Sequence, residues 1–330
     1  MIDYISIYNT YDIPKSEFSD MIWSEVFNSD KHYYFKNINT VKIMYFPDTQ
    51  RLMIQGKLIM LIENTQVKNL DDIYQHDTNR FINDVNKRIN TLFRSFKIDI
   101  RHFTAARIDY CYNVYTPYVQ AYLDFLNRAF TATDNGKRKN YALLNGLTGS
   151  VYIKPTAEYK ANTRTNYTLN FYNKADWIEN KRNSGLYISA EDEALAENIL
   201  RLEVQASYTL LKSQTERNHI QRTFGDLLSF DIAWSTISSV YKRVFHADET
   251  ADFYTYQVAK KQLSSLSAKK VLLRSAQRHS ITGTSYTYGI KQIKSCGIYP
   301  YSFLPPKFSP SSLPNPLQLI LEKVSHYETL

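Results

Sequence analysis

The stretch ARIDYCYNV, residues 106–114, decides the fold. Its polar side chains fall on one side of an extended chain: Arg107, Asp109, Cys111 and Asn113. Its apolar and aromatic side chains fall on the other side: Ile108, Tyr110, Tyr112 and Val114. Such alternation predicts a β-strand with one face for packing helices and one polar face.

Two later stretches repeat this pattern. They are NYTLNFYNK (166–174) and LRLEVQA (200–206). Their polar positions are Thr168, Asn170, Tyr172 and Lys174 in the first, and Arg201, Glu203 and Gln205 in the second. If the three strands are neighbours in one sheet, these faces merge into one polar surface. The alternative is a solvated sheet face with no chemical role.

Strands and helices are mixed along the chain without strict βαβ alternation. We expect strands at 2–9, 106–114, 150–155, 165–174 and 199–206, and two or three antiparallel strands within 41–64, with Pro47-Asp48 at the turn. We expect helices at 78–94, 117–130, 175–183 and 190–198. After about residue 215 the pattern becomes helical. The predicted fold is therefore α+β, with a mainly antiparallel sheet packed by helices in 1–230 and a helical, basic C-terminal region in 231–330.

Composition narrows the function. The chain has 40 Lys and Arg against 32 Asp and Glu, a net charge of +8, and it has 27 tyrosines. Positive charge together with many aromatic rings favours nucleic acid as a partner. An AT-rich genome is an alternative explanation for the number of tyrosines. Only 9 glycines are present, and no phosphate-binding glycine loop is found. Cys111 and Cys296 fit neither a zinc site nor a disulfide framework, so we expect a reducing cytoplasm. The first residues, MIDYISIYNT, do not resemble a signal peptide, and no apolar run is long enough to span a membrane.

The polar surface would carry a chemically useful set. Asp109 and Glu203 are oxygen donors of the kind that hold Mg²⁺ or Mn²⁺. Tyr172 is a candidate nucleophile, and Lys174 is a cation that would favour its phenolate. This set predicts a metal-assisted tyrosine transesterase. The alternative for the two acids is simple ion pairing with Arg107 and Arg201.

The order of these strands resembles that of replication initiators of the filamentous-phage gene II/X type and their plasmid relatives. The shared elements are an R-I-D strand, a Y-x-K strand that leads into an acidic helix, and an R-[FL]-E strand, over roughly residues 100–215. A weaker similarity lies in 283–306. The chain lacks the His-hydrophobe-His metal motif of some relatives; His102, just before the R-I-D strand, is a further candidate assistant.

The resemblance implies a rolling-circle initiator, with either a single or a duplicated replication-initiator fold. Such a protein nicks one origin strand and rejoins it through a 5′-phosphotyrosine intermediate. The nucleophile falls on Tyr172, the lysine on Lys174 and the two acids on Asp109 and Glu203. We expect origin DNA, a host helicase and a host polymerase as partners in a bacterial cytoplasm. The expected DNA contacts are Arg107, Arg201, Lys137, Arg138, Lys139, Lys154, Lys160 and Arg164, with further basic residues at 260–278.

Two other functions remain open at this point. One is a non-catalytic protein that binds an origin and melts it or controls copy number. The other is a relaxase-like nickase of a mobile element, which would use the same chemistry in DNA transfer.

Overall fold

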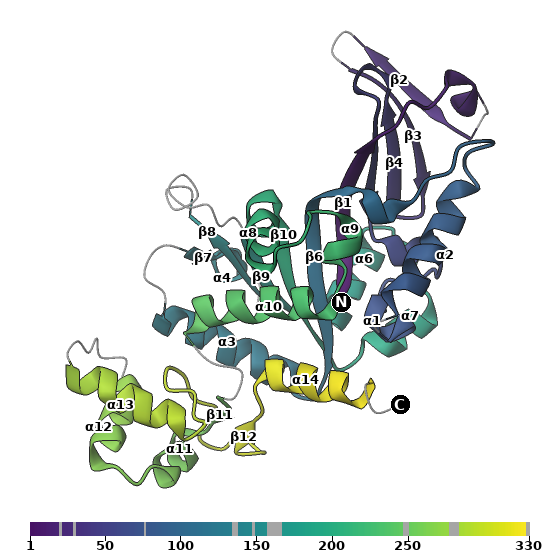
Figure 1. Cartoon of the computed structure of the whole chain (residues 1–330). Helices are drawn as coiled ribbons and strands as arrows, with labels where there is room; N and C mark the ends of the chain where they lie inside the picture. The colour runs from purple at the N-terminus through teal and green to yellow at the C-terminus, as the bar shows by residue number, and fades with distance from the viewer. Residues whose placement is uncertain are drawn as a thin grey trace.

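A ten-stranded antiparallel sheet organises the computed structural model of the chain (Figure 1). The structure describes residues 1–19, 22–28, 31–75, 77–133, 138–146, 149–156, 167–246, 251–276 and 284–327. The strand order is β2-β3-β4-β5-β1-β6-β10-β9-β8-β7, and each neighbouring pair is antiparallel. The predicted fold class, a mainly antiparallel α+β sheet packed by helices with a helical C-terminal region, is confirmed.

The two halves of the sheet repeat one topology. In each half a central strand is followed by a crossover and then by a four-strand meander, whose last strand returns beside the first. The strands of the first half are β1 (Ile2–Thr10), β2 (Ser24–Asn28), β3 (Lys31–Ile38), β4 (Val41–Phe46) and β5 (Arg51–Gly56). Those of the second half are β6 (Thr104–Tyr115), β7 (Arg138–Asn140), β8 (Ser150–Pro155), β9 (Tyr167–Asn173) and β10 (Ile199–Ser207). The central strands β1 and β6 pair with each other, so the halves meet in the middle of the sheet.

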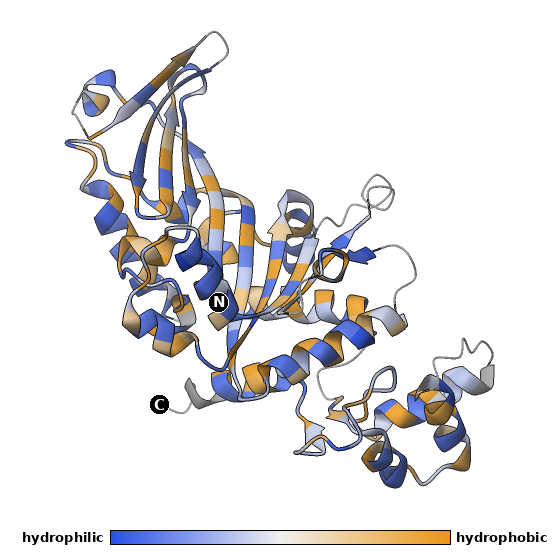
Figure 2. Cartoon of the chain, turned by 180° about the vertical axis from the view of Figure 1, so that it is seen from behind, coloured by the Kyte–Doolittle hydropathy of each residue, from blue (hydrophilic) through white to orange (hydrophobic). Residues whose placement is uncertain are grey.

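One face of the sheet is apolar and carries the main core. The alternation seen in the sequence appears as bands of hydrophobic and hydrophilic residues along the strands (Figure 2). Tyr110 of β6 donates a hydrogen bond to the Leu227 carbonyl, and the Phe171 ring of β9 packs on Tyr241. The elements whose apolar residues join this core include η1 (Lys15–Phe18), α2 (Thr78–Asn90), α3 (Val119–Thr133), α8 (Tyr208–Asn218), α9 (Phe224–Leu227), α10 (Phe230–Phe245) and α14 (Pro316–Tyr327).

The other face is polar and is only partly covered. Near its centre the polar side chains contact the 65–69 segment and α1 (Leu70–Tyr74), and α6 (Lys174–Asn183) packs on β9 and β10. α7 (Ala190–Ala196) packs on α6 and bonds to the 65–69 segment. α6 begins where β9 ends, because the Asn173 side chain caps its first turn by accepting from the Ala175 amide. The strands β2–β4 of the first half project beyond these helices (Figure 1).

The C-terminal region divides between two cores. α10 and α14 pack into the main core. The boundary expected from the sequence, at residue 230, coincides with the start of α10, so part of the expected C-terminal region belongs to the main core. In contrast, α11 (Tyr256–Gln262), α12 (Leu266–Ala276) and α13 (Thr284–Ser295) share a small core of their own and lie to one side of the sheet (Figure 1).

Most expected elements match the structure. The 41–64 stretch forms two antiparallel strands, β4 and β5, as expected, and it ends in the short helix η3 (Leu58–Leu61) rather than in a third strand. Strands β2 and β3 had no assignment from the sequence. No helix in the described ranges has both the length and the apolar character needed to cross a membrane.

Candidate functional site

Three strands place the predicted residues on one polar face. β6, β10 and β9 are consecutive neighbours in the sheet, which is the condition under which their polar faces form one surface. Residues opposite one another across antiparallel strands share a face. Their pairing creates three polar rows, which are Asn113–Arg201–Tyr172, Cys111–Glu203–Asn170 and Asp109–Gln205–Thr168. β1 extends the last row, since Tyr4 lies opposite Asp109.

Tyr172 and Glu203 are in direct contact. The Tyr172 hydroxyl donates a long hydrogen bond of 3.4 Å to Glu203 Oε2, and Gln205 donates to Oε1 of the same carboxylate at 3.1 Å. Burial raises the pKa of Tyr172 well above its ordinary value, and the Glu203 charge acts in the same direction. Burial also raises the pKa of Glu203. The tyrosine is therefore a protonated phenol beside a carboxylate with enhanced affinity for a proton, which is the relation of a nucleophile to a general base.

Asp109 forms a bidentate ion pair with Arg107, two residues earlier on the same strand. Arg107 donates from Nε and Nη2 to the two Asp109 oxygens at 2.7 and 2.6 Å. Despite this pair, burial together with the nearby Glu203 charge raises the pKa of Asp109 to about 7. The Asp109 side chain is 3% exposed and that of Arg107 is 41% exposed, so the carboxylate is fixed while the guanidinium reaches solvent.

The donor set has the charge that a divalent cation needs. Two carboxylates of raised pKa on one face carry excess negative charge, and a bound Mg²⁺ or Mn²⁺ would neutralise it. Both Asp109 oxygens are occupied by Arg107, so the guanidinium would have to move toward solvent to admit the ion. Within the part of the chain that the structure describes, no group of three or more His, Cys, Asp or Glu side chains forms a metal cluster. Asp109 and Glu203 would therefore act with water ligands.

Lys174 is the first residue of α6, and its side chain points toward the tyrosine. The side chain is buried, and its Nζ is 3.6 Å from the Trp177 ring centroid and 5.9 Å from that of Tyr172. Burial lowers the pKa of Lys174 well below its ordinary value, and the Arg201 and Lys57 charges add to the effect. An anion brought next to this amine would favour its protonated form.

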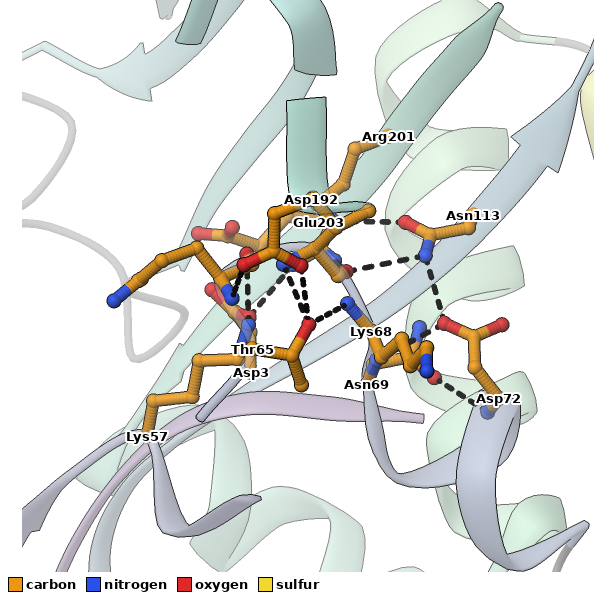
Figure 3. A network of polar contacts seen from close by, with 12 residues as sticks. Asp3, Lys57, Thr65, Lys68, Asn69, Asp72, Asn113, Asp192, Arg201 and Glu203 are labelled. Atoms are coloured by element: carbon orange, nitrogen blue, oxygen red, sulfur yellow. Dashed lines mark hydrogen bonds and ion pairs between the residues drawn. The ribbon is translucent and has the colours of Figure 1, made fainter. Parts of the chain in front are cut away.

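Arg201 is a structural residue in the centre of the polar face. It is completely buried. Its guanidinium donates to Asp3 Oδ1 at 2.6 Å, to Asn113 Oδ1 at 2.9 Å and to the Val67 carbonyl. These bonds tie β1, β6 and the 65–69 segment together (Figure 3). The expectation that Arg201 contacts DNA is therefore corrected, because no phosphate can reach a guanidinium that is buried and bonded internally.

The same network fastens the helices that cover this face. Asp192 of α7 accepts from the Thr65 hydroxyl and the Gln66 amide, both at 2.6 Å. Asn113 donates to Asp72 of α1 at 2.8 Å. Figure 3 shows these contacts converging from strands and helices. The network holds the covering segments in place beside the candidate site.

Two cavities flank Tyr172. The first, of about 360 Å³, extends from Tyr172 and Glu203 to Tyr152. The second, of about 400 Å³, lies on the side of Gly149 and Asp176. Tyr172 and Trp177 line both cavities. The hydroxyl that donates to Glu203 thus lies where a substrate atom can approach.

The predicted DNA contacts occupy different positions. Lys139 and Lys154 lie directly opposite each other on β7 and β8, at the edge of the sheet. Two like charges in this position repel unless an anion lies between them. Arg138 is held by the Tyr167 hydroxyl at 2.6 Å. Lys137, Lys160 and Arg164 lie outside the described residues. His102 is in η4 (Ile100–His102), where it pairs with Asp99 at 3.8 Å.

Sequence reasoning missed three residues of the site. Asp3 reaches Arg201 across 198 positions, and no local pattern signals such a contact. Lys57 bonds to the Gln66 carbonyl at 2.9 Å and pairs with Asp3 at 3.5 Å. Trp177 lies three residues after Lys174, so helical spacing could have placed the two side chains together.

Comparison of the chain with models of protein families, with curated proteins and with solved structures finds no match in any of the three.

Proposed function

We propose that the chain is a rolling-circle replication initiator that nicks and rejoins one DNA strand. The observation that carries the proposal is the contact between the Tyr172 hydroxyl and Glu203 at the wall of a cavity. The ordered R-I-D, Y-x-K and R-L-E motifs support it, since all three lie on neighbouring strands and direct their polar residues to one face.

The reaction is a transesterification. Tyr172 Oη attacks the scissile phosphorus, its proton passes to Glu203, and the bond from phosphorus to the 3′ oxygen breaks. The products are a 5′-phosphotyrosine and a 3′-hydroxyl, and the leaving oxygen takes its proton from solvent or a nearby acid. The 3′-hydroxyl primes synthesis by a host polymerase. Attack by a later 3′-hydroxyl reverses the reaction and rejoins the strand.

The other residues adjust the charge around the phosphate. An entering phosphate would favour the protonated form of Lys174, because an adjacent anion raises the pKa that burial has lowered. Asp109 and Glu203 would hold Mg²⁺ or Mn²⁺, which polarises a phosphodiester when bound. Arg107, released from Asp109, would be free to contact a phosphate. In this mechanism, DNA binding changes the protonation of Lys174 and the ion pairing of Asp109 and Arg107.

Covalent capture tests this function. Labelled single-stranded oligonucleotides that cover the DNA around the gene are incubated with the protein, Mg²⁺ or Mn²⁺, and SDS is then added. Wild type should give an SDS-stable adduct whose label maps to Tyr172, and Tyr172→Phe should give none while retaining its fold. Tyr152→Phe is the matched control, since Tyr152 lines the same cavity and should be dispensable. Adducts that persist in Tyr172→Phe would reassign the nucleophile. DNA binding without adducts in wild type would favour the non-catalytic initiator.

A further inference from the structure

The first half of the sheet has one covered and one open face. On strands β1, β4 and β5, the side chains that face the core, such as Ile7, Ile43 and Ile54, are completely buried. Tyr8 and Met53, which lie opposite each other on the other face of β1 and β5, are only half-buried, and Arg51 of β5 is exposed. Residues on one face of these strands are thus buried, while most of those on the other face reach solvent; Ser6 and Met44 are the buried exceptions.

Aromatic rings gather on the open face. The Tyr33 ring lies 5.3 Å from that of Phe46 and 6.0 Å from that of Phe35, centroid to centroid. All three are half-buried. The register of β2 to β5 and β1 assigns the following residues to this face: Ser24, Val26, Tyr33, Phe35, Asn37, Lys42, Met44, Phe46, Arg51, Met53, Gln55, Ser6, Tyr8 and Thr10.

Cations accompany these rings. Lys42 Nζ is 4.9 Å from the Phe35 ring centroid and 5.5 Å from that of Tyr33, and the Arg51 guanidinium is 4.4 Å from that of Tyr8. The residues that the register assigns to this face include no Asp or Glu. A surface of half-exposed rings and cations without acids attracts an anionic polymer that also offers flat apolar faces.

The open face is continuous with the candidate site. β1 pairs with β6, and Ser6 and Tyr4 of β1 lie opposite Arg107 and Asp109. The Arg107 guanidinium is 4.8 Å from the Tyr4 ring centroid, which repeats the pairing of a cation with a ring. Six strand-to-strand steps separate β3 from β9, a path of about 29 Å at ~4.8 Å per step.

We infer that this open face of β1–β5 is a platform on which single-stranded DNA stacks beside the nicking site. The inference rests on the proposed function for the identity of the polymer as DNA. Unpaired bases stack on the rings, and phosphates contact Lys42, Arg51 and Arg107. Duplex DNA fits this platform poorly because its bases are already stacked on one another and closed to the rings. The first half of the sheet thus holds the strand that the second half cuts.

The test measures binding without cleavage. In the Tyr172→Phe background, a 5′-fluorescein-labelled dT20 is titrated and its anisotropy is followed at two salt concentrations. Tyr33→Ala and Phe35→Ala should each weaken binding by about 5- to 150-fold, the range for loss of one stacked base. Tyr288→Ala, on exposed α13, is the control for loss of an exposed ring and should bind normally.

Two additions keep the test decisive if an alanine variant unfolds. Lys42→Glu removes no buried apolar group and should weaken binding at low salt, whereas Lys36→Ala, on the opposite sheet face of β3, should not. Photocrosslinking of an oligonucleotide containing 5-iodouracil should label peptides that include Tyr33 or Phe35. Unchanged affinity in Tyr33→Ala, Phe35→Ala and Lys42→Glu, or a preference for duplex over dT20, would overturn the platform. Normal dT20 binding by this face without any covalent adduct in wild type would instead overturn only the nicking function.

Discussion

Asp109→Asn tests whether the polar face carries excess negative charge. Burial and the Glu203 charge raise the pKa of Asp109 from 3.8 to about 7. Because this pKa is higher in the folded chain than in the unfolded chain, the folded chain binds more protons between about pH 4 and pH 7. The free energy of unfolding contributed by Asp109 therefore falls as pH rises through this window, and it levels off above the window.

The expected size of the effect follows from that shift. A rise of about 3 pKa units corresponds to roughly 4 kcal/mol, which for a chain of this length is about 6 °C in Tm. Asparagine does not titrate, so the difference in Tm between Asp109→Asn and wild type should move in favour of the variant, by up to about 6 °C, from pH 4.5 to pH 8. Lys57 and Lys174, whose pKa values are lowered by burial, act in the opposite direction as pH rises, but they are present in both proteins and cancel in the difference.

The assay is thermal unfolding followed by circular dichroism at constant ionic strength, first in EDTA and then with Mg²⁺ or Mn²⁺. Glu191→Gln, at a side chain that is 75% exposed, controls for loss of one negative charge. If Asp109 and Glu203 hold a cation, 10 mM metal with a Kd of about 1 mM should add roughly 1.4 kcal/mol to wild type at pH 8. It should add less at pH 5, where Asp109 is protonated, and less in Asp109→Asn. If Tm changes with pH in the same way for the variant and wild type, the pKa of Asp109 is not raised as described. If Tm does not change when metal is added, Asp109 and Glu203 do not hold a cation.

Three further substitutions separate catalytic, structural and binding roles. Glu203→Gln should slow single-turnover nicking about a hundredfold or more, because the tyrosine loses its proton acceptor, while the variant remains folded; near-normal rates would assign the base elsewhere. Arg201→Leu should lower the free energy of unfolding by about 3–5 kcal/mol, since Asp3 loses its shorter ion pair and keeps only the one with Lys57. A fully stable variant that had only lost DNA affinity would restore a DNA-contact role. Lys154→Ala should reduce the dependence of log Kd on log salt by about one unit, measured by anisotropy; an unchanged slope would argue against a phosphate contact at this edge of the sheet.

The predicted elements that match the structure are those that alternation or helical spacing specifies locally. β6, β9 and β10 have strict alternation, so both their extent and the side of the strand that faces the core could be read from the sequence. Strands β2 and β3 had no assignment, although they extend the sheet in order from β4, with β3 paired to β4 and β2 paired to β3. Their half-open face mixes aromatic and basic residues, so polarity does not alternate there as clearly as in a strand with one wet and one dry side.

The sequence predicted which residues share the polar face of the candidate site, but it did not predict that they are buried. Alternation placed Arg201, Glu203 and Lys174 on the polar face, and a polar face was expected to be wet. The covering 65–69 segment and α6 instead bury these side chains, and Asp3 and Lys57 neutralise part of the charge. These partners come from segments far away in the sequence. Burial is what changes the pKa values of Lys174 and Glu203, so the electrostatics of the site is a property of the tertiary fold.

The repeated topology gives a structural basis to the proposed division of roles between the two halves of the sheet. Because β1 and β6 are antiparallel central strands of two similar halves, an axis perpendicular to the sheet between them relates the halves and leaves their equivalent faces on one side. Equivalent strands β4 and β9 then carry Lys42 on the first half and Tyr172 on the second, both on this side. One half carries rings and cations where the other carries carboxylates and the tyrosine. Under the proposed function, this arrangement would let the first half hold a single strand of DNA while the strand reacts on the second half.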